Sequence, residues 1–261
     1  MGLALGAGLA AAPAPRARLV ISDRNAEKRA RAEDLGVSAT DDNEALARES
    51  DVLILAVKPQ HLKALCATLA PALERARPLL ISVAAGIRVE DLDAWLGGGQ
   101  WIVRAMPNTP ALLRAGTSVL YAGAGVPARE RALAETLLAT VSRVFWVPEE
   151  ALMDAATAVS GSGPAYLFLF LEALIAAGAK AGLPPALAAD LARSTTLGAA
   201  RMAEGGDVDV ATLRARVTSP GGTTERAIAS LLADDFPGMM ARAVAAACAR
   251  SRQLSAEWGA S

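Results

Sequence analysis

The chain of 261 residues contains one histidine, His61, and only two cysteines, Cys66 and Cys248. Neither cysteine belongs to a CxxC pair or to another metal-ligand spacing, so we expect neither a disulfide framework nor a zinc site. A single histidine excludes a multi-histidine metal centre, and a Ser-His-Asp triad could be built only around His61. We therefore predict no metal site and interpret His61 as a partly exposed helix residue.

An excess of charge of one sign is also missing, because 26 Lys and Arg residues face 27 Asp and Glu residues, for a net charge of -1. No global field would attract nucleic acid or an anionic membrane, so we expect neither as a partner. The longest apolar run, residues 164–180, contains Glu172 and is shorter than the ~20 residues of a membrane span. We expect it to form a buried helix of a soluble protein, whose 53% hydrophobic content can fill a substantial core.

The first twelve residues, MGLALGAGLAAA, carry no charge and three glycines. This composition is compatible with a secretory signal, a phosphate-binding glycine loop or a helix. A signal peptide has a basic region before its apolar segment, whereas the first charge here is Arg16. Residues 10–12 do resemble a cleavage site, but the segment that follows has the texture of a cytosolic nucleotide-binding fold. We therefore expect a cytoplasmic protein.

Short apolar runs alternate with helical segments through the first half of the chain. Continuous apolar strands, buried on both faces, suit a parallel sheet covered by helices, so we predict a doubly wound α/β domain over residues 1–149. From residue 150 to 261 the sequence is rich in alanine and leucine and predicts an all-helical domain. Strands are expected at 18–22, 52–57, 79–83, 101–105, 117–121 and 143–147, and helices at 24–35, 60–73, 89–96 and 127–140.

Distinctive motifs follow successive strands of the first half, where an open α/β sheet binds its ligand. Residues 22–24 (SDR) offer an acid for ribose hydroxyls, and a serine and an arginine for a 2′-phosphate, so NADH and NADPH both stay open. Residues 58–59 (KP) place a lysine before a helix, residues 83–86 (VAAG) are small, and residues 104–110 (RAMPNTP) form a double-proline turn. Each of these motifs alone is compatible with an ordinary turn, and in the first of them Asp23 could simply cap the following helix. Their recurrence favours a binding crevice.

Two motifs of the helical half combine hydroxyls and glycines ahead of an apolar helix. They are TAVSGSGPAY at 157–166, with Pro164 in the first turn of a helix, and TSPGGTT at 218–224. Backbone N–H groups and hydroxyls at such places can bind a small carboxylate without any cation. The alternative interpretation is simple helix capping.

Five motifs together resemble the pyrroline-5-carboxylate reductase family, in order and spacing, over essentially the whole chain. The more specific ones are SGSGPAY and TSPGGTT. The resemblance implies reduction of 1-pyrroline-5-carboxylate to L-proline, the last step of proline biosynthesis, with hydride from NADPH or NADH. It also implies an N-terminal Rossmann domain and a helical domain that forms a homodimer or a larger homo-oligomer by interlacing helices. The five motifs are AVKP at 56–59, VAAG at 83–86, RAMPNTP at 104–110, SGSGPAY at 160–166 and RVTSPGGTT at 216–224.

The same resemblance implies roles for individual residues. Thr157 would hydrogen-bond the imine nitrogen as the catalytic residue, and Glu150 would lie near the substrate ring. The substrate carboxylate would be held by Ser219, Gly222, Thr223 and Thr224. Cofactor binding would fall on Met1, Gly2, Ser22, Asp23, Arg24, Asn43, Ala56, Val57, Lys58, Pro59, Val83, Ala84, Ala85 and Arg216.

The start of the chain departs from the family pattern. In the family an apolar strand leads into a GxGxMG loop, and Met1-Gly2 aligns with the end of that loop, so we expect the first strand of the sheet to be missing. Gly6-Ala7-Gly8 falls within the helix that follows and is not the fingerprint. We expect an internal start or a trimmed chain, with weakened cofactor binding.

Two alternatives remain open. The first is a reductase of the β-hydroxyacid dehydrogenase type, which would need a catalytic lysine in the helical half, where Lys180 is the only one. The second is an inactive dimerising protein, because the helical half is intact and the nucleotide half is not.

Overall fold

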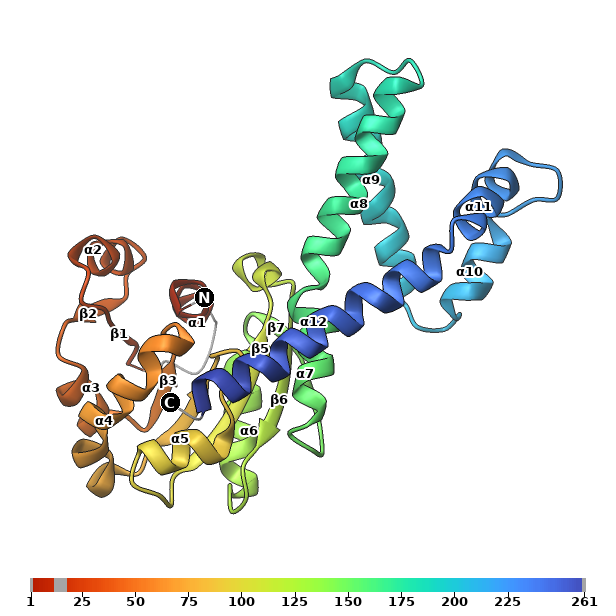
Figure 1. The fold of residues 1–261 in the computed structure, drawn as a ribbon. Helices are drawn as coiled ribbons and strands as arrows, with labels where there is room; N and C mark the ends of the chain where they lie inside the picture. Colours follow the sequence, from red (N-terminus) through yellow and green to blue (C-terminus); the bar gives the residue numbers. More distant parts are fainter. Residues whose placement is uncertain (1, 12–17, 260–261) are drawn as a thin grey trace. The chain divides into compact units, whose positions relative to one another are not determined.

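The computed structural model describes residues 2–11 and 18–259 and divides into two compact units (Figure 1). The first unit comprises Met1–Ser162 with Ala246–Ser261, and the second comprises Gly163–Ala245. The boundaries of these units differ from those of the predicted domains, 1–149 and 150–261. The reason is that the last turns of the chain and the segment before residue 163 pack with the sheet.

The first unit has the order expected of an α/β fold. Its elements are α1 (Gly2–Ala10), β1 (Val20–Ser22), α2 (Ala26–Asp34), β2 (Ser38–Thr40), α3 (Asn43–Glu49), β3 (Val52–Leu55), α4 (Pro59–Ala76), β4 (Leu79–Ser82), α5 (Val89–Trp95), β5 (Trp101–Pro107), the 3-10 helix η1 (Thr109–Leu113), β6 (Gly116–Ala122), α6 (Ala128–Ala139), β7 (Ser142–Trp146), α7 (Leu152–Ala156) and the π-helix η2 (Thr157–Gly161). The predicted fold class, a Rossmann-type sheet followed by helices, is confirmed. The short elements β2 and α3 were not predicted.

The strands form a five-stranded sheet of order β3-β4-β5-β6-β7 and a two-stranded sheet of β1 and β2. Pairing is parallel except between β5 and β6, which run antiparallel, so the predicted parallel sheet is mixed at this point. The reason is the connection. A parallel neighbour needs a crossover of a dozen or more residues, and only η1 and two short turns separate β5 from β6.

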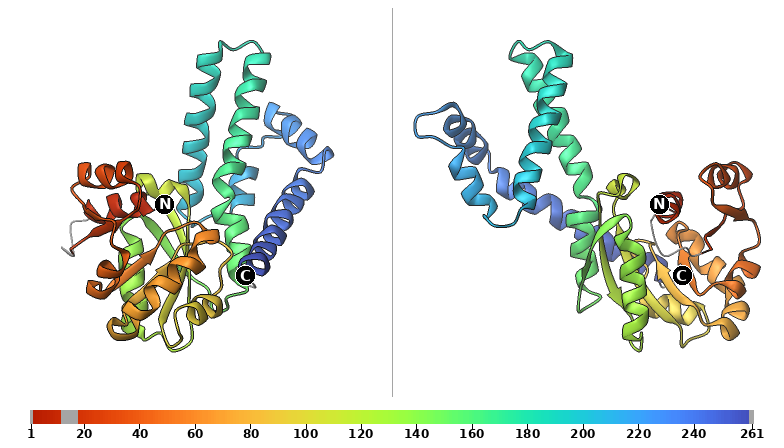
Figure 2. Two further views of the ribbon diagram at one scale, coloured as in Figure 1. Left: turned by 60° about the vertical axis from the view of Figure 1, so that its left-hand side comes forward. Right: turned by 180° about the vertical axis from the view of Figure 1, so that it is seen from behind.

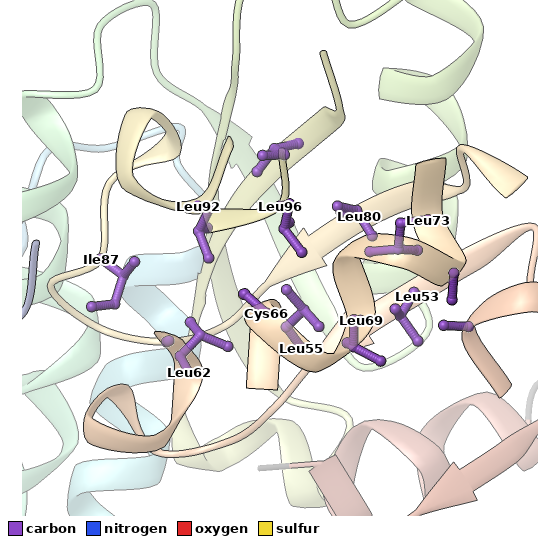
Figure 3. Packing of buried hydrophobic residues seen from close by; sticks show 14 residues of the cluster. Leu53, Leu55, Leu62, Cys66, Leu69, Leu73, Leu80, Ile87, Leu92 and Leu96 are labelled. Atoms are coloured by element: carbon purple, nitrogen blue, oxygen red, sulfur yellow. The ribbon is translucent and has the colours of Figure 1, made fainter. Parts of the chain in front are cut away.

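Helices cover both faces of the larger sheet, as the alternation of its side chains requires. On β4, Leu80 belongs to one hydrophobic cluster while Leu79 and Ile81 belong to the other, and all three are at most 1% exposed. Figure 3 shows the first cluster, in which α4 packs Leu62, Cys66, Leu69 and Leu73 against the sheet. Each fully buried leucine contributes about 1.5–3 kcal/mol, so these two layers dominate the stability of the unit.

The last part of α12 (Phe236–Gly259) belongs to this first unit. Trp258 packs against the cluster beneath α5, and Ser251 donates its hydroxyl to Asp154 Oδ1 of α7 at 2.6 Å. Gly86, in the left-handed region at φ +78°, approaches Leu254 so closely that a Cβ would lie 2.9 Å from the leucine Cβ. These contacts join the last part of α12 to α7 and to the loop after β4.

The second unit is helical, with α8 (Gly163–Lys180), α9 (Pro185–Glu204), α10 (Val210–Arg216), α11 (Thr223–Ala233) and the first part of α12. Figure 2 shows α8 and α9 side by side, and a Cβ on Gly178 would meet Ala188 at 3.3 Å. No residue of α8 is buried, although its sequence is strongly apolar, so the expectation of a buried helix is wrong for the single chain. A helix hydrophobic on all sides needs neighbours on all sides, and one hairpin partner cannot cover it.

The continuous helical segment Leu152–Lys180 has the length and apolar composition to cross a membrane. One such helix is weak evidence, since helices that other protein surfaces cover in an assembly have the same composition.

Candidate active site

The predicted cofactor residues of the first unit lie at the carboxyl ends of three strands. Ser22 ends β1, Ala56 follows β3 and Val83 follows β4. The N-terminus of α1 reaches the same region, because a Cβ built on Gly2 would lie 3.2 Å from the Ala56 Cβ. A helix N-terminus beside small residues at strand ends suits a dinucleotide pyrophosphate. Met1 lies outside the described residues.

At the end of β1, the Ser22 hydroxyl donates to Asn43 Oδ1 at 2.7 Å and so ties the strand to the start of α3. Asp23 accepts from the Asn25 backbone N–H at 2.9 Å and from Lys28 Nζ at 3.1 Å. Burial works to raise the pKa of Asp23, but these hydrogen bonds and the nearby positive charges hold it below its usual value. The cap of α2 is Asn25, so the capping role considered for Asp23 is wrong.

Exposed Arg24 adjoins this pair. The end of β1 therefore offers a hydroxyl and a guanidinium to an adenosine ribose or its phosphate, while the Asp23 carboxylate is already engaged.

The segment after β3 is open to solvent at Ala56 and Lys58, and Val57 is half-buried. Pro59 occupies the first position of α4, one residue before the predicted start at residue 60, and its missing N–H costs nothing there. His61 is exposed in the first turn of that helix, which confirms its interpretation as a helix residue. The Lys58 ammonium can therefore reach a ligand along this strand end.

After β4 the chain continues through small residues. The Val83 N–H donates to the Leu55 carbonyl at 3.1 Å, which keeps this segment in register with β3. Ala84 is buried, while Val83 and Ala85 are half-buried. Their small side chains leave room for a flat ring to approach the backbone.

Glu150 is anchored by an ion pair that the sequence did not predict. Its Oε1 accepts from Arg104 Nη1 of β5 at 2.7 Å and from the Val89 N–H of α5 at 2.8 Å. The Arg104 side chain is 7% exposed and the Glu150 side chain 22%. Arg104 was visible as the first residue of the RAMPNTP motif, but its partner lies 46 residues away and no local signal identifies it.

Thr157 begins the π-helix η2 and donates its hydroxyl proton to the Met153 carbonyl at 2.7 Å. Its oxygen lone pairs remain available to a donor on a ligand. The π-helix packs beside the end of β5, because Asn108 Nδ2 donates to the Ser160 carbonyl at 3.1 Å.

The predicted carboxylate site lies in the second unit, together with Arg216, while the other cofactor residues lie in the first. The turn before α11 has Gly221 at φ +74°, and the Gly222 N–H donates to the Ser219 carbonyl at 3.0 Å. Thr223 and Thr224 form the first turn of α11, which carries no side-chain cap. The Gly221 N–H donates to Glu225 Oε2 at 2.8 Å. The two threonine hydroxyls and the N–H groups of the first turn of α11 suit a small carboxylate.

A Rossmann-type sheet with small residues and a helix N-terminus at its strand ends, followed by helices, defines a nicotinamide-dinucleotide-dependent oxidoreductase. Residues 1–86 match the family model described as NADP oxidoreductase coenzyme F420-dependent, and residues 150–254 match pyrroline-5-carboxylate reductase dimerisation. The chain belongs to the pyrroline-5-carboxylate reductase family.

Individual relatives agree. The chain is 46% identical to the pyrroline-5-carboxylate reductase of Pseudomonas aeruginosa over 260 residues, covering 99% of this chain and 95% of the relative. The structure of a pyrroline-5-carboxylate reductase from Coxiella burnetii superposes with a TM-score of 0.91 at 40% identity, over 97% of this chain and 94% of the other. The Plasmodium falciparum enzyme with NADP bound gives 0.87 at 32% identity, over 98% and 94%.

Membership of the pyrroline-5-carboxylate reductase family excludes the alternative that the chain is a β-hydroxyacid dehydrogenase. Lys180, the lysine that alternative would need, is exposed at the last position of α8. Residues 2–11 and 18–259 contain no group of three or more His, Cys, Asp or Glu side chains that could hold a metal.

Proposed function

We propose that this chain reduces 1-pyrroline-5-carboxylate to L-proline, the last step of proline biosynthesis, with NADPH or NADH. The observation that carries the proposal is the 46% sequence identity to the Pseudomonas aeruginosa pyrroline-5-carboxylate reductase, which extends over 99% of this chain. The nicotinamide cofactor supplies the hydride when bound. It would be held by residues at strand ends and at the first positions of α1, α3 and α4, together with Met1 and Arg216. They are Gly2, Ser22, Asp23, Arg24, Asn43, Ala56, Val57, Lys58, Pro59, Val83, Ala84 and Ala85.

The substrate carboxylate would accept hydrogen bonds from the first turn of α11 and the turn before it. Ser219, Thr223 and Thr224 offer hydroxyls, and Gly222 keeps the backbone accessible. The positive end of a helix favours an anion, so no cation is needed at this place.

Thr157 would accept a hydrogen bond from the protonated imine nitrogen. The hydroxyl proton is already directed at the Met153 carbonyl, so the oxygen is oriented as an acceptor. A cyclic imine accepts hydride readily once protonated, and the product amine keeps that proton, so no side chain needs to titrate during the step. Holding the ring and the nicotinamide at the right distance would supply most of the rate.

Glu150 would lie near the substrate ring and at the same time hold α7 in place. Its Oε1 is occupied by Arg104 and Val89, which leaves Oε2 for a ligand.

We also propose a homodimer or larger homo-oligomer, in the cytoplasm, with neither nucleic acid nor membrane as a partner. Support comes from α8, where Leu167, Phe168, Leu169 and Phe170 are between 44% and 66% exposed. A second copy of the chain would cover these side chains, and apolar patches of this kind mark interfaces. Light scattering of the Leu169→Glu variant should show a smaller species than the parent chain. Leu113→Glu, at an exposed leucine of η1, is the control and should leave the assembly unchanged.

The reaction is tested by following NADPH oxidation with and without 1-pyrroline-5-carboxylate. Oxidation that depends on this imine supports the proposal. Oxidation with a β-keto acid instead would support a β-hydroxyacid dehydrogenase. A folded dimer that does not oxidise NADPH with either substrate would be an inactive dimerising protein.

A further inference from the structure

The helical segment that carries Thr157 is not a regular α-helix. Between α7 and α8 it contains the single π-turn η2, in which the Ser162 N–H donates to the Thr157 carbonyl five residues earlier, at 2.9 Å. Single π-turns inside α-helices are rare and occur often at functional sites.

The sequence explains why the regular pattern fails here. In an α-helix the Ser160 carbonyl would accept from the N–H of residue 164, but that residue is Pro164, which has no N–H. The regular α-helical donor to this carbonyl is therefore missing, and a buried carbonyl needs a donor from elsewhere.

Asn108 supplies that donor from the end of β5. Its Nδ2 donates to the Ser160 carbonyl at 3.1 Å, and its Oδ1 accepts from the Thr117 N–H of β6 at 2.8 Å. The residue is only 8% exposed. Both ends of the amide are in use, so a carboxylate or an apolar side chain of the same size cannot replace it.

Close packing accompanies this hydrogen bond. A Cβ on Gly161 would lie 2.6 Å from Met106 Cε, so the π-turn rests directly on the end of β5. Thr157, four residues before Gly161 in the same turn, is thereby held in a fixed position relative to the end of β5.

We propose that Asn108 is a positioning residue, which holds the π-turn and with it Thr157 against the carboxyl end of β5. Pro164 maintains the π-turn by denying the Ser160 carbonyl a helical donor. The proposal rests on the proposed function through the role of Thr157 at the imine. It assigns Asn108 no contact with substrate or cofactor.

The test combines Asn108→Asp and Pro164→Ala, alone and together. Asn108→Asp keeps the acceptor for Thr117 but sets a carboxylate oxygen against the Ser160 carbonyl, so Tm falls and kcat falls by about ten- to hundredfold, as for a misplaced reacting group. KM for NADPH stays within about twofold, since the cofactor residues lie elsewhere. Pro164→Ala restores a helical donor, so Tm is kept while kcat falls.

In the double variant the restored N–H recovers Tm but not kcat, because the π-turn has been lost. Pro185→Ala, in the first turn of α9, is the matched control and keeps the parent values of both. Recovery of kcat in the double variant, or a parent-like kcat in either single variant, would overturn the proposal. A parent chain without imine-dependent turnover would refute the proposed function instead. The Tm comparison needs no turnover and would then still decide whether Asn108 and Pro164 hold the π-turn.

Discussion

Replacing Glu150 by alanine should destabilise the first unit by about 3 kcal/mol. The substitution leaves the Arg104 guanidinium without its negative partner and the Val89 N–H without its acceptor, after loss of contacts of 2.7 and 2.8 Å. Removing one member of a buried ion pair costs about 3–5 kcal/mol. The lower end applies because the Glu150 side chain is 22% exposed and water can partly replace it.

Three further variants separate the contributions to this loss. Glu150→Gln keeps an acceptor for Val89 and should cost less, about 2 kcal/mol. The double variant Arg104→Leu/Glu150→Ala removes both charges and should cost less than the sum of the single changes. Glu90→Gln breaks the exposed Arg88–Glu90 pair, whose side chains are 53% and 71% exposed, and should cost no more than about 0.5 kcal/mol.

Urea unfolding followed by circular dichroism and by tryptophan fluorescence measures these differences. For a unit of about 150–250 residues, 3 kcal/mol corresponds to roughly 6–12 °C in Tm. If Glu150→Ala changes the unfolding free energy no more than Glu90→Gln does, the Arg104–Glu150 pair does not anchor α7 to the sheet and the reasoning fails.

Burial raises the pKa of the Cys66 thiol to about 12. Iodoacetamide at neutral pH should therefore label the half-buried Cys248 and leave Cys66 intact until the chain unfolds. Mass spectrometry of the peptides checks this, and equal labelling of the two cysteines would contradict the packing around Cys66. Gly8→Ala should lower the unfolding free energy by about 1–3 kcal/mol, because its Cβ would overlap a valine before β7. Gly198→Ala in α9 meets no atom within 4 Å and should raise it by about 0.5–1 kcal/mol, which makes it the matched control. The lowered pKa of Asp23 means that its carboxylate stabilises the fold above its ordinary pKa and that this stabilisation disappears as the pH falls through the lowered value. Asp23→Asn should therefore be less stable than the parent at pH 7, and the difference should shrink as the pH falls through the lowered pKa. A difference that stays constant with pH would exclude the mechanism.

Much of the fold was predictable because its signals are local. The run VLILAV predicted β3, and the lysine and proline after it predicted the start of α4 to within one residue. By contrast, β2 has the sequence SAT and α3 the sequence NEALARE, so neither carries the apolar pattern that marks the other strands and helices. The candidate site followed from motifs at strand ends, since the carboxyl ends of parallel strands share one edge of the sheet.

What the sequence by itself determined is the alternation of elements, the helix starts at prolines and caps, and the motifs that carry the family resemblance. Tertiary structure alone decided that Glu150 pairs with Arg104 and that Asn108 reaches a carbonyl 52 residues away. It also left the apolar α8 uncovered in the single chain. Periodicity and capping depend on neighbours in the chain, whereas ion pairs, orphan carbonyls and burial depend on which distant segment arrives beside them.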